Sequence, residues 1–206
     1  MESFDELLVQ AEAAHGHLCA GQILGVRMAM LACRRLDVAE PRGADRKKLV
    51  SYVEIDRCAT DAIGMVTGCR LGKRALKFRD WGKMAATFVN LATGRALRIV
   101  ALENSRQLAA QRYPEIENKS RQQMQAYREL SDEELFREQW VAVDLPPREL
   151  PGYKGERVTC AECGEGVNFD RFVERPAPDG VLGGEKLRLC LSCADPTLRY
   201  WRPIEN

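Results

Sequence analysis

The amino-acid sequence contains no long apolar run and no basic leader. None of its apolar stretches reaches the roughly 18–20 residues that a helix needs to cross a bilayer. The first ten residues carry three acidic side chains, Glu2, Asp5 and Glu6, and no basic one, which is unlike a secretory signal peptide. We therefore expect a soluble, cytoplasmic protein with no membrane partner.

The sequence also lacks a charge imbalance. Its 31 basic and 30 acidic residues give a net charge of +1. Proteins that bind the phosphate backbone of nucleic acids usually carry a clear excess of basic residues. We therefore expect no nucleic-acid partner. Aromatic residues make up only 7% of the chain, but apolar residues make up 45%. In a chain of this length that is enough for one good core and a small additional module.

Histidine is scarce, with two residues, whereas cysteine is unusually frequent, with eight. Without an export signal the cysteines should stay reduced, and clustered reduced cysteines indicate metal ligands or reactive thiols. They form two groups, which are Cys19, Cys33, Cys58 and Cys69 in the first third and Cys160, Cys163, Cys190 and Cys193 near the end.

Proline marks the domain boundary, because seven of the nine prolines lie at Pro146 or later. The segment 146–155 is rich in proline and glycine, cannot continue a helix and is typical of a linker. We therefore predict one domain at residues 1–145, a linker at 146–155 and a small domain at 156–206.

Within residues 1–145 the hydrophobic periodicity predicts helices and strands in an irregular order. The expected helices are 4–14, 21–36, 103–112 and 118–130. Two more are expected, one that Asp56 caps and that ends at about residue 67, and a short one after Ser131. The expected strands are 49–55, 75–78, 85–91, 97–102 and 139–145. This mixing favours an α+β fold over a doubly wound sheet. Gly21, Gly25 and Ala29 form a stripe of small residues that suits close packing, either inside one subunit or between two.

The C-terminal cysteines form the stronger metal signal. Cys160-x-x-Cys163 and Cys190-x-x-Cys193 are separated by 26 residues, and a two-residue spacer lets a tight turn aim both sulfurs at one tetrahedral ion. Four thiolates fill the coordination of Zn²⁺, so this site should be closed and structural, and it should supply folding free energy to a module with few large apolar residues. Redox dithiols are the alternative.

The N-terminal group is less regular. His15, His17 and Cys19 alternate along a short segment just before a predicted helix, and Cys58 lies near the start of another. The free amides and dipole at a helix N-terminus favour a thiolate. Two imidazoles with one or two thiolates suit Zn, Fe, Co or Cu, so we predict one transition-metal ion on His17, Cys19 and Cys58. His15 is either a fourth ligand or an outer group, and Asp61, three residues after Cys58, can orient a ligand or move a proton.

These residues lie in motifs that resemble the FmdE family, which is named for a component of formylmethanofuran dehydrogenase. The motifs are His15-Gly-His-x-Cys-x-Gly21, Val53-Glu-x-x-x-Cys58-x-x-Asp61, Thr67-Gly-Cys-x-x-Gly-Lys73 and Asp80-x-Gly-Lys83. Members often have proline after the first cysteine, where this chain has Ala20. The resemblance covers residues 1 to about 145, and the Cys160–Cys193 segment is similar to the treble-clef zinc module that many members add.

The resemblance implies a thioredoxin-like core with a mixed five-stranded sheet flanked by helices, a treble-clef zinc finger and a homodimer. It also implies a metal site at His15, His17, Cys19 and Cys58, with Cys58, Asp61 and Lys73 as candidate catalytic residues. The first functional hypothesis is a subunit or accessory factor of a molybdenum or tungsten one-carbon oxidoreductase. A stand-alone metalloenzyme and a thiol redox protein using Cys19, Cys58 and Cys69 are the alternatives.

Overall fold

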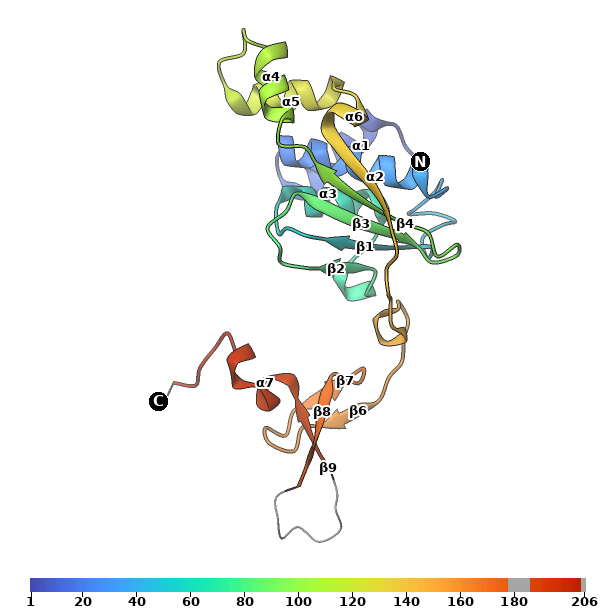
Figure 1. The fold of residues 1–206 in the computed structure, drawn as a ribbon, viewed down its shortest axis with the longest axis vertical. Coiled ribbons are helices and arrows are strands. Elements are labelled where there is room, and N and C mark those ends of the chain that lie inside the picture. The colour runs from blue at the N-terminus through green and yellow to red at the C-terminus, as the bar shows by residue number, and fades with distance from the viewer. Residues whose placement is uncertain (178–185, 205–206) are drawn as a thin grey trace. The chain divides into compact units, whose positions relative to one another are not determined.

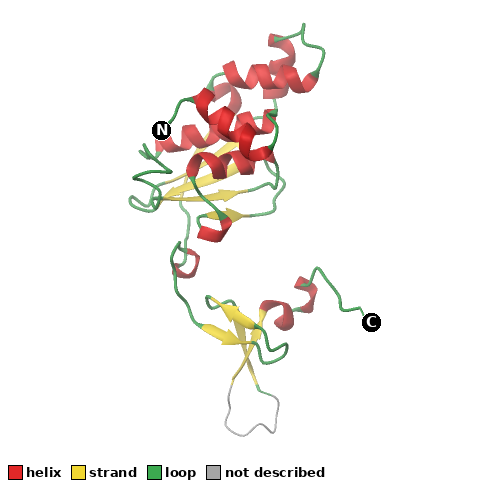
Figure 2. Cartoon of the chain, turned by 180° about the vertical axis from the view of Figure 1, so that it is seen from behind, coloured by secondary structure: helices red, strands yellow, loops and turns green. Residues whose placement is uncertain are grey.

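The computed structural model describes residues 1–177 and 186–204 (Figures 1 and 2). Its internal contacts divide the chain into two compact units, Met1–Leu145 and Pro146–Asn206. Among the described residues, no helix combines the length and the apolar character needed to cross a membrane.

A five-stranded mixed sheet is the base of the first unit, with the strand order β2-β1-β3-β4-β5. β1 runs parallel to β2, whereas the other neighbouring pairs are antiparallel. The strands are β1 (Leu49–Val53), β2 (Leu76–Phe78), β3 (Ala85–Asn90), β4 (Ala96–Ala101) and β5 (Phe136–Val141). The predicted α+β class with a mixed five-stranded sheet is confirmed.

The α-helices of this unit lie on one side of the sheet (Figure 2). They are α1 (Phe4–His15), α2 (Ala20–Arg35), α3 (Cys58–Thr67), α4 (Ser105–Arg112), α5 (Lys119–Glu129) and the one-turn α6 (Asp132–Leu135). Ile23 and Met28 of α2 are fully buried in one cluster with Phe88, Leu97 and Ile99 of the sheet. Burying each such side chain contributes about 1.5–3 kcal/mol, so the packing of α2 on the sheet is a substantial part of the core stability.

Several of the expected boundaries differ from the structure, and two of the differences have a clear physical reason. Arg57, not Asp56, is the N-cap of α3, because its backbone is still extended (φ −122°, ψ 173°), and the turn before it is closed by the Thr60 hydroxyl donating to the Ile55 carbonyl. The last strand begins at Phe136, immediately after α6, because Phe136 is buried and pairs with Ala101.

The stripe of small residues on α2 packs against α3 inside the first unit. A Cβ atom added to Gly25 would lie 2.5 Å from the Ala59 carbonyl oxygen and 2.8 Å from the Ala62 Cβ. Gly21 faces the same helix, at Cys58 and Ala59. The two helices therefore meet nearly backbone to backbone, which resolves the choice that the sequence left open for this stripe.

The second unit contains two short hairpins and a helical turn. β6 (Arg157–Thr159) pairs with β7 (Gly166–Asn168), and β8 (Phe172–Pro176) pairs with β9 (Lys186–Cys190), which leads directly into α7 (Leu191–Ala194). Single 3₁₀ turns occur at Pro147–Glu149 and Pro196–Leu198, and a third, Leu71–Lys73, belongs to the first unit. The turn between β6 and β7, the β8–β9 hairpin and α7 follow one another in the order expected of a treble-clef zinc module.

We predict that Gly25→Ala lowers the free energy of unfolding of the first unit by about 1–3 kcal/mol, because the added methyl group overpacks the α2–α3 contact. Gly72→Ala is the matched control, since nothing lies within 4 Å of a Cβ there. Urea unfolding followed by far-ultraviolet circular dichroism measures both variants. Equal midpoints for the two would show that the helices can separate without cost.

Candidate metal centres

His15, His17 and Cys19 come together at the corner between α1 and α2. His15 is the last residue of α1, Gly16 turns the chain with a left-handed backbone (φ 93°), and Cys19 is the N-cap of α2. One ligand atom from each of the three residues lies within 4.8 Å of the others, and the two imidazole centroids are 4.9 Å apart. The corner thus gathers two nitrogen donors and one sulfur donor, a set that suits a transition metal.

Asp61 fixes the orientation of His15. Its Oδ2 lies 2.9 Å from His15 Nδ1, and the His15 side chain is only 18% exposed, whereas that of Asp61 is 62% exposed. A carboxylate on one ring nitrogen selects the tautomer that leaves the other nitrogen free to bind a metal. The geometry therefore agrees with the expected orienting role of Asp61.

Cys58 lies beside this cluster and not within it. It begins α3, and its thiol contacts the Cys19 thiol, but it is absent from the set of mutually close donors that the described residues form around His15. Burial, followed by the Cys19 thiol, raises the pKa of Cys58. Both effects oppose the thiolate that the position at a helix N-terminus favours, so the Cys58 thiolate stays a prediction.

The remaining N-terminal candidates lie apart from the cluster. Cys33 is a buried core residue, and burial raises its pKa to about 12. Cys69 is 3% exposed and receives a hydrogen bond from the Ser51 hydroxyl. Burial raises the pKa of Cys69 too. Lys73 is exposed on the 3₁₀ turn that follows.

Sequence reasoning missed Gln22, which is fully buried one turn after Cys19. Its side-chain amide donates to the Cys58 carbonyl at 2.7 Å, so it ties the start of α3 to the start of α2 next to the cluster. The available signal was a polar residue on an otherwise apolar helix face.

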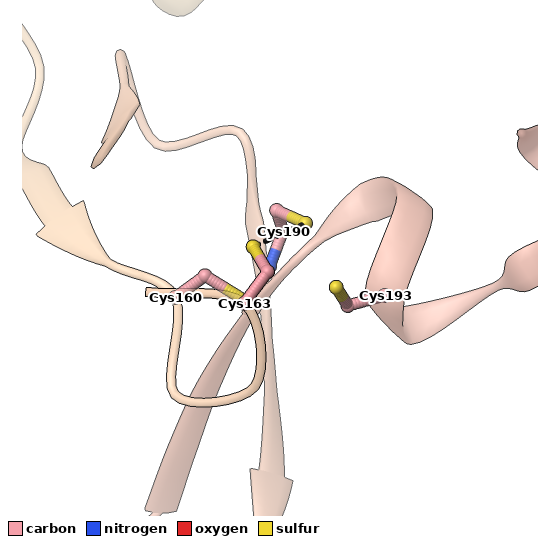
Figure 3. Close-up of side chains that lie close together, drawn as sticks. All are labelled: Cys160, Cys163, Cys190 and Cys193. Carbon is pink, nitrogen blue, oxygen red and sulfur yellow. Dashed lines mark hydrogen bonds between the residues drawn. The ribbon is translucent and has the colours of Figure 1, made fainter. Parts of the chain in front are cut away.

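The four C-terminal cysteines form a second cluster (Figure 3). Cys160 and Cys163 lie on the knuckle between β6 and β7, and Cys190 and Cys193 come from the end of β9 and from α7. Their sulfurs all lie within 4.8 Å of one another, with 4.0 Å between Cys163 and Cys190. Sulfurs around one Zn²⁺ at about 2.3 Å would be separated by slightly less than 4 Å, so the cluster fits a four-thiolate ion.

Backbone amides stabilise one thiolate of this site. Burial by itself raises the pKa of the Cys160 thiol, but N–H groups of Cys163, Cys190 and Glu162 donate to its sulfur and lower the pKa to about 6. The Cys190 amide lies 3.3 Å from that sulfur. By contrast, burial and the neighbouring thiols of Cys190 and Cys163 raise the pKa of Cys193 to about 12. All four thiolates can therefore coexist only around a positive ion.

Arg199 is an outer partner of this cluster that the sequence did not reveal. Its guanidinium donates to the Cys193 sulfur at 3.3 Å and to the Ser192 carbonyl at 3.0 Å. A cation in this position offsets part of the negative charge that four thiolates leave on a divalent ion.

The family model described as "FmdE, Molybdenum formylmethanofuran dehydrogenase operon" matches residues 14–137. The chain belongs to the FmdE family. The matched region contains His15, His17, Cys19, Cys58 and Asp61, and it ends before the Cys160–Cys193 cluster. The first candidate metal site therefore lies in the FmdE domain, and the second lies outside the matched region.

Two relatives of this FmdE-family chain extend the comparison. It is 31% identical over 210 residues to a "Probable S-adenosyl-L-methionine-binding protein" of Archaeoglobus fulgidus, with 91% of this chain and 52% of the relative aligned. The chain thus spans about half the length of that curated relative. The solved structure of an FmdE-like protein of the tungsten formylmethanofuran dehydrogenase type, from Syntrophus aciditrophicus, matches with a TM-score of 0.61 and 22% identity, over 96% of this chain and 95% of that one. That likeness shows a shared fold.

We predict that Asp61→Asn weakens metal binding at the N-terminal cluster by about 10- to 100-fold, because His15 loses the charged partner that orients it. Asp56→Asn is the control, since Asp56 is exposed and two residues before Cys58. Competition titration of Co²⁺ against a chromophoric chelator measures both. Unchanged affinity in Asp61→Asn would remove His15 from the ligand set.

We also predict that Cys160→Ser releases the C-terminal ion and makes residues 156–206 sensitive to protease, while the first unit stays resistant. The buried cluster of this unit is small, comprising Cys160, Leu189, Cys193 and Ala194, so the metal bonds must supply much of its stability. Ser192→Ala, which keeps all four thiols, should retain the ion. A resistant Cys160→Ser module would show that the ion is dispensable for folding.

Proposed function

We propose that this FmdE-family chain is a metal-binding subunit or accessory factor of a molybdenum or tungsten oxidoreductase of one-carbon chemistry, of the formylmethanofuran dehydrogenase type. The cluster of His15, His17 and Cys19, with Asp61 bonded to His15, is the observation that carries the proposal. The family description, which refers to the molybdenum formylmethanofuran dehydrogenase operon, supports the choice of partner enzyme.

The two centres have different roles in this proposal. Cys160, Cys163, Cys190 and Cys193 hold a structural Zn²⁺ that has no open position. His15, His17 and Cys19 hold Zn²⁺ or another transition metal, with Cys58 as the fourth ligand or as a free thiol next to it. A metal with three protein ligands supplies Lewis-acid chemistry or a water of lowered pKa.

The residues around the N-terminal centre then have separate tasks. Asp61 holds a proton on His15 Nδ1 and so keeps the other ring nitrogen available. Gln22 holds the start of α3 in place through the Cys58 carbonyl. Lys73 is proposed as a charged group of the site on the basis of the family motif.

The alternatives depend on the same residues. A stand-alone metalloenzyme would use the N-terminal centre with its own substrate. A thiol redox protein would use Cys19 and Cys58, whose thiols are in contact. Burial of Cys69, and its hydrogen bond from Ser51, argue against a redox role for that third cysteine.

The proposal predicts two metal ions per chain in the wild type and one in His17→Ala, because only the N-terminal cluster loses a ligand. Atomic absorption on the full chain measures the ratio, and Asp56→Asn should retain both ions. Cys58→Ser tests the fourth ligand in the same assay. One ion per wild-type chain, together with two titratable thiols at Cys19 and Cys58, would favour the redox alternative.

A second measurement addresses the partner. The wild-type chain, coexpressed with the catalytic subunits of a molybdenum or tungsten formylmethanofuran dehydrogenase, should copurify with them through size exclusion. Light scattering on the chain alone should give the mass of the homodimer that we propose. A monomeric chain that does not copurify with the catalytic subunits would contradict both expectations.

Binding of S-adenosylmethionine is a second candidate function, favoured by the name of the Archaeoglobus relative. Since only 52% of that relative aligns, the ligand site of the relative can lie in the half that this chain does not match. Isothermal titration of the full chain with S-adenosylmethionine decides between these cases. Saturable binding would show that this chain contains an S-adenosylmethionine site. A flat titration would indicate that the site of the relative lies in its unaligned half.

A further inference from the structure

A cavity of about 420 Å³ in the first unit shares a residue with the N-terminal cluster. Asp61 lines the cavity, and the same carboxylate is bonded to His15. Its other walls come from α3, from the segment that follows α3, from β2, from the end of α1 and from Arg42. A molecule in this cavity would therefore lie one side chain away from the cluster.

Three charged side chains line the cavity, and they differ in whether they have a partner. Arg42 is already paired with Glu2, and it also donates to Gln10. Asp61 is engaged by His15. Arg70 is exposed and lines the cavity, and no acidic side chain among the described residues pairs with it. One guanidinium is thus left to attract an anion.

The rest of the lining is largely apolar. Met65 of α3, Leu71 of the 3₁₀ turn and Leu76 of β2 border the cavity. Leu71 is 65% exposed, so its side chain is accessible to a molecule in the cavity. A guanidinium beside an apolar wall matches a ligand with an anionic head and a short hydrocarbon body.

We infer that this cavity binds a small organic monoanion, with a carboxylate head on Arg70 and an aliphatic body against Met65, Leu71 and Leu76. The planar guanidinium can pair with a carboxylate through two parallel N–H···O bonds, which a lysine cannot reproduce. The inference extends the proposed function, on which it rests for its chemical purpose, by naming the ligand class that the metal centre would meet.

The probes are acetate, butyrate and hexanoate, titrated into the full-length, metal-replete protein and followed by amide chemical shifts. The affinity should rise about fourfold with each methylene group that the apolar wall covers. Hexylamine, which has a similar length and the opposite charge, should not bind at the same amides. Binding of hexylamine equal to that of hexanoate, or no binding of any carboxylate, would overturn the inference.

Three variants locate the site. Arg70→Ala should weaken hexanoate binding at least about tenfold, and Arg70→Lys should restore only part of the loss. Leu71→Ala should weaken hexanoate more than acetate. Arg46→Ala is the matched control, because Arg46 is an exposed arginine whose guanidinium contacts only the Gly43 carbonyl among the described residues. Hexanoate affinity that is indifferent to Arg70→Ala would show that the anion binds elsewhere.

His17→Ala separates this inference from the proposed function. If the variant loses one metal ion and still binds hexanoate through Arg70, both statements hold. If the wild type carries only one ion and Arg70→Ala still abolishes hexanoate binding, the metal proposal fails and the anion site stands. If the metal count is two and no carboxylate binds, the anion site fails alone.

Discussion

The close approach of α2 and α3 is the contact on which the rest of the first unit depends. Gly25 lets the two backbones meet at Ala59 and Ala62, and Gly21 leaves room for Cys58. Since α2 also carries the buried side chains that pack on the sheet, the position of α3 is set relative to the whole core. The start of α3 is thereby placed next to the α1–α2 corner, where His15, His17 and Cys19 meet.

This placement joins segments that are distant in the chain. Asp61, one turn into α3, reaches His15 across 46 positions of sequence, and Gln22 returns a hydrogen bond to the Cys58 carbonyl. Asp61 also lines the neighbouring cavity, so a single carboxylate links the cluster to the anion site that we infer. A shift of α3 would disturb all of these contacts together.

The second unit is held together differently. Its buried cluster is too small to offset the chain entropy of the whole segment by apolar burial alone. Four sulfurs converge beside this small cluster in an arrangement that fits a metal ion, and backbone amides donate to Cys160 while the Arg199 guanidinium donates to Cys193. The chain thus carries two candidate metal sites, one with nitrogen and sulfur donors in the first unit and one with four sulfurs in the second.

Local pattern by itself determined the α+β class, most of the helices and strands of the first unit, and the four-cysteine cluster. These depend on periodicity, capping and a two-residue ligand spacing, all of which act between near neighbours. The short helix after Ser131, for example, forms as predicted, and a capping box begins it. Only the tertiary structure decided that Cys58 lies beside the His15 cluster and not within it, that Asp61 bonds to His15, and that Gln22 and Arg70 belong to the same region. Those relations depend on how α3 packs against α2, and a sequence records packing between distant segments only indirectly, through the small residues that allow it.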